Sequence, residues 1–300
     1  MAVKEEVRVA IGQIKVKMLD TEANLERMAK ALEEVASRGG ADLVVFPELA
    51  SQGYVVHGTG LRGDPKQKAF IVDYRREASP VPGRFSDGLG EIARKHNCYV
   101  ISGLAEAHPT ISANLYNSAV LVGPDGKVLG VHRKVHVPGG EKSYFHGGNT
   151  LEVYDTDLGK LSMMVCADFC APEAARTLTM KGAEIICVPY AYAAGMYRDD
   201  EMFNRAQSTR AWENSNFMVN ANQVGSNGEW EFWGRSCVAD PFGSYIAMGE
   251  PFTEEIVVAT LRRDDLLAAR ASYNRFRDRR PDMYGPLIDT FNESWTRKLP

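Results

Sequence analysis

The chain has 300 residues, of which 44% are hydrophobic and 25% charged, with a formal charge of −4 and an isoelectric point near 5.9. These values are typical of a soluble globular protein that is long enough to bury a large core. The weakly acidic balance excludes a polyanion-binding surface, and no apolar run approaches the roughly 20 residues that span a bilayer, so neither nucleic acid nor a membrane is expected as a partner. With five cysteines and no N-terminal signal segment, we expect reduced thiols in a cytoplasmic protein.

Short runs of alternating or continuous apolar residues recur along the chain and predict strands. These runs cover residues 7–14, 42–48, 99–104, 116–123, 161–166, 184–190, 217–225 and 255–261. The turn sequence GPDG at 123–126 predicts a hairpin that leads into a further strand at 128–135.

Helical spacing lies between some of these strands and is clearest over 22–38. There, apolar residues recur at helical intervals from Leu25 to Val35, and Gly39 provides a C-terminal stop. Further helices are expected at 86–96, 172–181, 200–214 and 263–272. Strands and helices alternate early in the chain and strands then follow one another, which predicts a layered α/β fold rather than a simple doubly wound sheet.

The chain shows no linker, repeat or low-complexity segment, and we predict one domain over residues 1–280. The tail at 281–300 lacks clear periodicity but carries six large apolar or aromatic residues. They are Met283, Tyr284, Leu287, Ile288, Phe291 and Trp295. Because such residues leave apolar surface exposed unless they are covered, we expect the tail to pack on a partner subunit.

Cys166 stands at the end of the apolar run LSMMV, just before a predicted helix. Free backbone N–H groups at such a position can bind an oxyanion, and a helix N-terminus lowers the pKa of a thiol. Most cysteines are nevertheless buried and inert, so the position alone does not decide the role. The other cysteines have no comparable setting and are assigned to packing. They are Cys98, Cys170, Cys187 and Cys237.

Two charged residues are placed near strand ends, where sites in α/β folds gather. Glu48 follows the apolar strand DLVVFP, although a surface carboxylate is the commoner reading of such a position. Strand alternation puts Lys134 on one face with His132 and His136, and an inward lysine needs an anionic partner. A metal site built from the two histidines is the alternative, but no cluster of acidic or cysteine ligands accompanies them.

Two loops carry further candidates. Glu141 lies in the glycine-bounded segment GGEKSYFHGG and, taken alone, reads as a solvated charge. The aromatic residues Trp230, Phe232 and Trp233 can wall a pocket, cover a core edge or make a subunit contact, and the sequence leaves these alternatives open. The chain lacks the G-x-S-x-G elbow of serine hydrolases and the glycine-rich nucleotide motifs, so neither chemistry is indicated.

Taken in order, these segments resemble the nitrilase superfamily, the carbon–nitrogen hydrolases with a Glu-Lys-Cys triad. The matching segments are 44–54, 132–138, 141–148, 163–176, 234–243 and 275–287. The resemblance implies that Glu48 is the general base, Lys134 the oxyanion-binding lysine and Cys166 the nucleophile, with Glu141 as an assisting glutamate. It also implies a four-layer α-β-β-α sandwich, a homodimer or larger homo-oligomer, and no metal or organic cofactor.

The nucleophile segment departs from the family pattern in an informative way. Ala167 stands where an aromatic residue is common, and Cys170 stands where an arginine is common. Phe169 and Cys170 cannot bind a carboxylate, which weakens the case for a substrate that carries one. Asp168 resembles the amidases and carbamoyl hydrolases rather than true nitrilases.

We therefore expect an amidase or N-carbamoyl-amine hydrolase that works through a thioester on Cys166, with the backbone N–H of Ala167 as an oxyanion donor. The expected pocket residues are Tyr54, Tyr144, Asp168, Tyr190, Trp212 and Trp233. Glu229 and Glu231 favour a substrate with a cationic or neutral amine tail. The alternatives are a true nitrilase and a non-catalytic binding protein on the same fold.

Overall fold

The computed structural model describes residues 3–55, 65–272 and 275–288, and their strands form two main sheets. In the first sheet the strand order is β15 (Glu255–Arg262), β1 (Glu6–Gln13), β2 (Leu43–Val45), β3 (Tyr99–Ala107), β4 (Leu115–Val122) and β5 (Val128–Arg133), and β6 (Phe145–His146) pairs with β4. In the second sheet the order is β14 (Tyr245–Met248), β13 (Cys237–Ala239), β10 (Phe217–Asn222), β9 (Ile185–Tyr190), β8 (Gly159–Met163) and β7 (Val153–Thr156). A separate ribbon pairs β11 (Val224–Ser226) with β12 (Glu231–Trp233).

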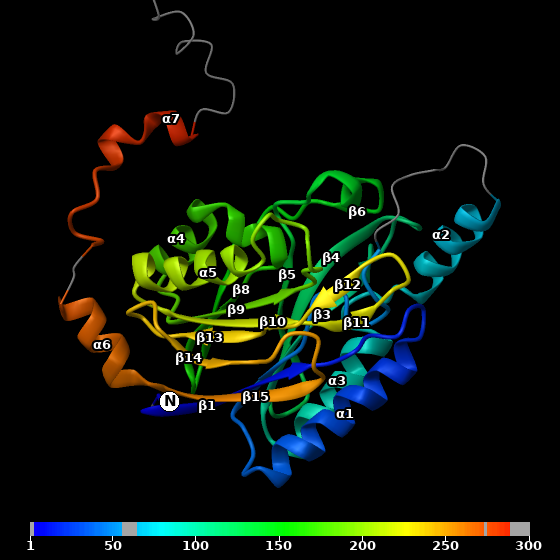
Figure 1. The fold of residues 1–300 in the computed structure, drawn as a ribbon, viewed down its shortest axis with the longest axis horizontal. Helices are drawn as coiled ribbons and strands as arrows, with labels where there is room; N and C mark the ends of the chain where they lie inside the picture. Colours follow the sequence, from blue (N-terminus) through cyan, green and yellow to red (C-terminus); the bar gives the residue numbers. More distant parts are fainter. Residues whose placement is uncertain (1–2, 56–64, 273–274, 289–300) are drawn as a thin grey trace, which may run out of the picture.

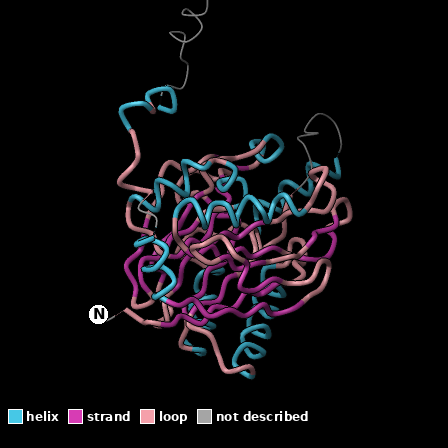
Figure 2. Tube along the Cα trace, turned by 60° about the vertical axis from the view of Figure 1, so that its left-hand side comes forward, coloured by secondary structure: helices cyan, strands magenta, loops and turns pink. Residues whose placement is uncertain are grey.

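Helices cover both outer faces of the paired sheets (Figure 1). The first sheet is covered by α1 (Thr21–Ser37) and α3 (Arg84–His96), and the second by α4 (Pro172–Met180) and α5 (Glu201–Asn214). Figure 2 shows the same arrangement after a rotation, with strands in the middle and helices above and below. The short helix α2 (Pro65–Glu77) lies at one end of the layers, and α6 (Arg263–Ser272) leads into the tail.

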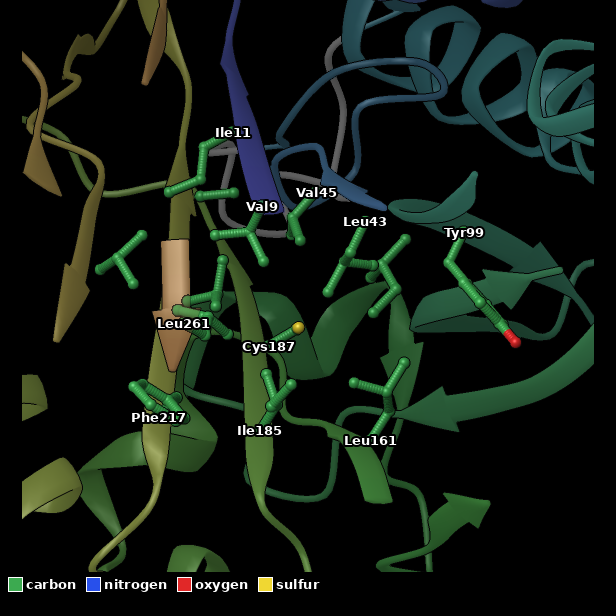
Figure 3. Packing of buried hydrophobic residues seen from close by; sticks show 14 of the residues in the cluster. Val9, Ile11, Leu43, Val45, Tyr99, Leu161, Ile185, Cys187, Phe217 and Leu261 are labelled. Carbon is green, nitrogen blue, oxygen red and sulfur yellow. The ribbon is translucent and has the colours of Figure 1, made fainter. Parts of the chain in front are cut away.

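Three apolar clusters fill the three interfaces that four layers create. The central cluster joins the inner faces of the two sheets, where Val9 and Ile11 of the first face Ile185 and Phe217 of the second (Figure 3). The second cluster packs α1 and α3 on the first sheet, and the third packs α4 and α5 on the second. Each sheet is therefore buried on both faces, which explains its continuous apolar strands and confirms the predicted α-β-β-α sandwich.

Local signals explain most of the element boundaries. The side chain of Asp20 accepts a hydrogen bond from the N–H of Ala23 and caps α1, which ends before Gly39 at a φ of +98°. The predicted hairpin between β4 and β5 forms, with Gly126 at a φ of +78°. All five predicted helices are present, whereas α2, α7 (Gly285–Ile288) and several short strands were not predicted.

The topology brings the carboxyl ends of the two sheets together. Strands β1, β2 and β3 are parallel in one sheet, and β8, β9 and β10 are parallel in the other. Glu48 follows β2, and its backbone N–H donates to the carbonyl of Tyr190 at the end of β9 at 3.4 Å. Side chains that follow strands in both sheets therefore meet at this end of the sandwich.

The tail extends away from the layers (Figure 1). It contains η3 (Pro281–Met283) and α7 (Gly285–Ile288), and the side chains of Met283, Leu287 and Ile288 are exposed. Phe291 and Trp295 lie outside the described residues. Across the described ranges, none of the helices has the length and apolar character that crossing a bilayer requires.

Candidate active site

Lys134 is the centre of a buried charged cluster. Its ammonium nitrogen Nζ donates to Glu48 Oε1 at 2.7 Å and to the two oxygens of Glu141 at 2.7 and 2.9 Å. The side chain of Lys134 is fully buried, and the two carboxylates are almost as inaccessible. Burial alone would lower the pKa of Lys134, but Cys166, Glu48 and Glu141 together raise it above its usual value. The lysine is therefore held as a cation between two carboxylates.

The backbone around Lys134 fixes where its side chain begins. Strand β5 ends at Arg133, one residue earlier than strand alternation through Lys134 requires. The N–H of Lys134 donates to the carbonyl of Asn117 at 2.8 Å, and its carbonyl accepts from Gly148 at 2.8 Å. The lysine is thus held between strand β4 and the loop that follows β6. Glu141 lies just before that strand, in the short helix η1 (Gly139–Ser143).

Asn117 joins the cluster although the sequence analysis did not single it out. Its side-chain amide donates to Glu48 Oε1 at 2.6 Å and to Glu141 Oε2 at 3.1 Å. The signal was a fully buried polar residue within the otherwise apolar strand LYNSAVLV, because a buried amide requires hydrogen-bonding partners.

The two carboxylate oxygens of Glu48 differ in their hydrogen bonding. Oε1 accepts from Lys134 and Asn117, while Oε2 has no hydrogen-bond partner among the described residues. Burial and the neighbouring Glu141 raise the pKa of Glu48, and Lys134 opposes that rise. A carboxylate with a raised pKa and a free oxygen is suited to accept a proton.

Cys166 begins the short helix η2 (Cys166–Cys170) that follows β8, and its backbone has a φ of +43°. A left-handed conformation at a non-glycine residue costs about 1–3 kcal/mol, and such strain gathers at functional sites. Burial and the carboxylate of Glu48 raise the pKa of this thiol, while Lys134 and the backbone N–H of Ala191 lower it in part. The net direction is upward because desolvation and the nearby negative charge favour the neutral form of the thiol.

Two backbone positions flank the nucleophile. Ala167 is half-buried directly after Cys166, and no carbonyl in the described part of the chain accepts a hydrogen bond from its N–H. Its N–H is therefore available as a donor. Ala191, which follows β9, was not predicted, and it supplies the second N–H beside the thiol.

Asp168 is not a pocket residue, because its carboxylate is fully buried and both oxygens are occupied. Oδ1 accepts from the N–H groups of Val135 and His136 at 3.0 and 2.8 Å and from His136 Nδ1 at 2.9 Å. Oδ2 accepts from His132 Nε2 at 2.8 Å and from the N–H of Val165 at 3.0 Å. Burial would raise the pKa of Asp168, but the histidines and the N–H donors lower it well below its usual value. Both histidine rings therefore form hydrogen bonds with the carboxylate of Asp168.

An aromatic group borders the cluster on the side of Glu141. The hydroxyl of Tyr54 donates to Glu141 Oε1 at 2.5 Å, and Trp230 stacks on the Tyr54 ring with centroids 5.8 Å apart. Phe232 meets the same ring edge-on at 6.2 Å, and Tyr144 belongs to the same apolar cluster. Tyr54 therefore connects the charged cluster directly to the loop before β12.

Two other predicted pocket residues lie in the core beneath the site. Tyr190 is fully buried, and its ring stacks on Phe203 at 4.6 Å. Trp233 is buried and meets Tyr192 edge-on at 5.8 Å. Tyr190 supports the site through its backbone, because its carbonyl accepts from the N–H of Glu48.

Two other assignments are wrong. Trp212 lies on the outer side of α5, half-exposed, where the guanidinium of Arg275 covers its ring at 4.3 Å. Cys170 was assigned to packing but is exposed, and it borders a cavity of about 190 Å³ together with Tyr197 and Arg210. The reason in both cases is that the residue falls on the outward side of its helix. Cys98, Cys187 and Cys237 are buried, as predicted.

The site combines one cation, two carboxylates and a cysteine whose backbone is strained. Comparison with known proteins shows that the chain resembles one family over almost its whole length. A family model described as carbon-nitrogen hydrolase matches residues 8–271. The chain belongs to the carbon–nitrogen hydrolase family. It is therefore a hydrolase that acts on carbon–nitrogen bonds other than peptide bonds, and it shares the nitrilase-superfamily fold.

Individual relatives match most of the length of the chain. A nitrilase from Pyrococcus abyssi is 34% identical over 93% of this chain and 99% of its own. An N-carbamoylputrescine amidase from Solanum lycopersicum is 29% identical over 89% of both chains. The crystal structure of a carbon-nitrogen hydrolase from Helicobacter pylori G27 superposes with a TM-score of 0.81 at 28% identity, covering 95% of this chain and 99% of that one.

Proposed function

We propose that the protein hydrolyses a small amide or N-carbamoyl amine through a thioester on Cys166. The observation that carries this proposal is the free Oε2 of Glu48, in a carboxylate whose other oxygen is fixed by Lys134 and Asn117. That oxygen is a base with one open position beside a neutral thiol. Acyl transfer requires this combination when the thiol has a raised pKa.

In the first half of the reaction, Glu48 takes the proton of Cys166 as the sulfur attacks the carbonyl carbon. The resulting oxyanion is bound by Lys134 Nζ and by the N–H of Ala167. Lys134 already makes three hydrogen bonds, and the longest, 2.9 Å to Glu141 Oε2, is the one it exchanges for the oxyanion. The carbon–nitrogen bond then breaks, and Glu48 gives its proton to the leaving nitrogen.

In the second half, Glu48 takes a proton from water as the water oxygen attacks the thioester carbon. The same two donors bind the second oxyanion. The carbon–sulfur bond breaks, and the proton on Glu48 returns to Cys166. Glu141 keeps Lys134 charged and in place throughout, so no metal or organic cofactor takes part.

The substrate class is supported by the nucleophile segment and by one relative. The sequence CAD at 166–168 matches the amidase and carbamoyl-hydrolase pattern, and a tomato relative is named an N-carbamoylputrescine amidase. Glu229 and Glu231 are exposed on either side of Trp230, which stacks on Tyr54. These acidic side chains favour a substrate with an amine tail. Putrescine-like diamines should compete with simple aliphatic amides for the site, and no inhibition by such cations would contradict this preference.

A true nitrilase is the second candidate, because the Pyrococcus abyssi relative carries that name. Matched panels of amides, N-carbamoyl amines and nitriles, read by ammonia release, separate the two functions. Turnover confined to nitriles would replace the amidase proposal.

The decisive experiment is mass spectrometry of the intact protein shortly after substrate is added. We expect a mass gain equal to the acyl or carbamoyl group, located on Cys166. Cys166→Ala and Cys166→Ser should show neither the adduct nor hydrolysis, while Cys187→Ala, a buried thiol in the central core, should keep both. Hydrolysis by purified Cys166→Ala would contradict a thioester at this residue.

We also propose that a second copy of this chain is the partner of the tail. The side chains of Met283, Leu287 and Ile288 are exposed, and such apolar surface is usually covered. Truncation after residue 274 should shift the protein to a smaller species in sedimentation equilibrium. The five cysteines are free thiols, which supports a reducing, cytoplasmic compartment.

A further inference from the structure

The two proposed oxyanion donors belong to separate segments of the chain. Lys134 follows β5 of the first sheet, and Ala167 lies in η2, which follows β8 of the second sheet. An oxyanion hole functions only when its donors are held at a fixed separation before the charge develops. Some feature of the structure must therefore tie these two segments together.

Asp168 makes that tie with a single side chain. Its Oδ1 accepts from the backbone N–H groups of Val135 and His136, the two residues directly after Lys134. Its Oδ2 accepts from the backbone N–H of Val165, directly before Cys166. The carboxylate thus forms hydrogen bonds with the backbone of the Lys134 segment and with the backbone of the Cys166 segment.

The two histidines complete the connection. His132 Nε2 binds Oδ2 at 2.8 Å from two residues before Lys134, and His136 Nδ1 binds Oδ1 at 2.9 Å. The same residue also holds the strained turn through its backbone, because the carbonyl of Val165 accepts the backbone N–H of Asp168 at 3.0 Å just before the positive φ of Cys166. All five hydrogen bonds to the carboxylate come from donors that flank the site, and none comes from within it.

We propose that Asp168 is a positioning residue that fixes the separation between Lys134 Nζ and the N–H of Ala167. This inference rests on the proposed acyl-transfer function. It assigns Asp168 no contact with the substrate. A carboxylate suits this place because both oxygens face backbone donors, and an amide would turn one acceptor into a donor, against the N–H of Val165 at one oxygen or against those of Val135 and His136 at the other.

The test is Asp168→Asn, which keeps the size of the side chain. We expect kcat to fall on the order of 100-fold, as when an oxyanion donor is lost, while KM changes far less. Because a substitution near the nucleophile can also alter the thiol itself, two further measurements separate the effects.

The first measurement is the rate at which iodoacetamide alkylates Cys166, a displacement that develops no oxyanion. The second is the protection of Cys166 against that alkylation by butyraldehyde. Its carbon bonds to the sulfur as the C=O π bond opens, the thiol proton passes to Glu48, and the aldehyde oxygen becomes an oxyanion. In Asp168→Asn the alkylation rate should stay close to that of the wild-type protein, and the affinity for butyraldehyde should fall about as far as kcat. The aldehyde measurement needs no turnover, so it tests Asp168 even if every proposed substrate fails.

The matched control is Asp240→Asn. Asp240 also accepts backbone N–H groups in a turn, those of Phe242 and Ser244, but it lies outside the site. It should leave alkylation and aldehyde affinity unchanged. The proposal is overturned if folded Asp168→Asn keeps its aldehyde affinity, or if alkylation and aldehyde affinity fall by the same factor.

A second variant decides the matter if Asp168→Asn does not fold. His136 is half-exposed, and His136→Ala removes one of the five hydrogen bonds while the backbone N–H of residue 136 keeps its own. We expect the same pattern on a smaller scale, with aldehyde affinity reduced several-fold and alkylation unchanged. Unchanged aldehyde affinity in this variant would contradict the proposal.

Discussion

Two buried carboxylates near Cys166 have opposite surroundings. Glu48 and Asp168 are both fully buried, yet Asp168 receives five hydrogen bonds and Glu48 leaves one oxygen without a partner among the described residues. The pKa of Glu48 is accordingly raised, chiefly by burial, whereas the donors around Asp168 lower its pKa in spite of burial. The number of donors at each oxygen thus distinguishes the proposed proton acceptor, Glu48, from the proposed positioning residue, Asp168.

The largest effect expected from this comparison follows from Glu48→Gln. The amide cannot accept the proton of Cys166, so kcat should fall by roughly 10³-fold in steady-state hydrolysis. Glu184→Gln is the matched control, because Glu184 pairs with Arg263 away from the site and should leave kcat unchanged. A Glu48→Gln variant with near-normal kcat would show that the free oxygen is not the base.

Lys134→Met tests the other side of the same cluster. Removing the ammonium leaves Glu48 and Glu141 buried without a cation, which should cost on the order of 3 kcal/mol of unfolding free energy at neutral pH. Lys134 is the group that lowers the pKa of Glu48, so this pKa should rise further in the variant. A carboxylate whose folded pKa is raised stabilises the fold at low pH and loses that contribution as pH increases through the folded value.

Urea unfolding of Lys134→Met at several pH values measures this dependence. The free energy of unfolding should be larger at acidic than at alkaline pH relative to the wild-type protein. The same free-energy difference at every pH would contradict the assignment of uncompensated carboxylates.

The same cluster shows which site residues can be predicted from the sequence and which cannot. Glu48, Lys134, Glu141 and Cys166 were predicted because each stands in a segment of recognisable order. Asn117 was not predicted, although a polar residue inside an apolar strand signals a buried partner. Its partner Glu48 lies 69 positions away, and only the pairing of strands brings the two together.

The role of Asp168 was misread for a related reason. The sequence places it two residues after Cys166, which suggests a pocket, but the direction of its side chain depends on donors that come from β5 and the residues after it. Trp212 fails in the same way, because its exposure depends on which side of α5 faces the second sheet. The layered fold was easier to predict, since continuous apolar strands require cover on both faces.

Tyr54→Phe should have a moderate effect. It removes the hydroxyl that donates to Glu141 Oε1, and a hydrogen bond to a charged group contributes about 1.5–3 kcal/mol. Glu141 orients Lys134, so kcat should fall about tenfold at the lower limit of that range. Tyr99→Phe removes a similar hydroxyl–carboxylate bond, to Asp157 at 2.6 Å, outside the site, and should lower thermal stability without changing kcat. Equal kcat losses in the two variants would separate Tyr54 from catalysis.

The smallest effect concerns His136, which is partly exposed and bonded to Asp168. The hydrogen bond to Asp168 raises the pKa of His136 above its usual value. A histidine with a raised folded pKa contributes its full stabilisation below the unfolded value of about 6.5 and loses it as pH rises through the raised value. Solvent screening limits the contribution to less than about 1 kcal/mol. The difference in unfolding free energy between the wild-type protein and His136→Ala should therefore shrink between mildly acidic and alkaline pH, measured by urea unfolding. A difference that grows with pH would mean that the neutral ring, rather than the cation, stabilises Asp168.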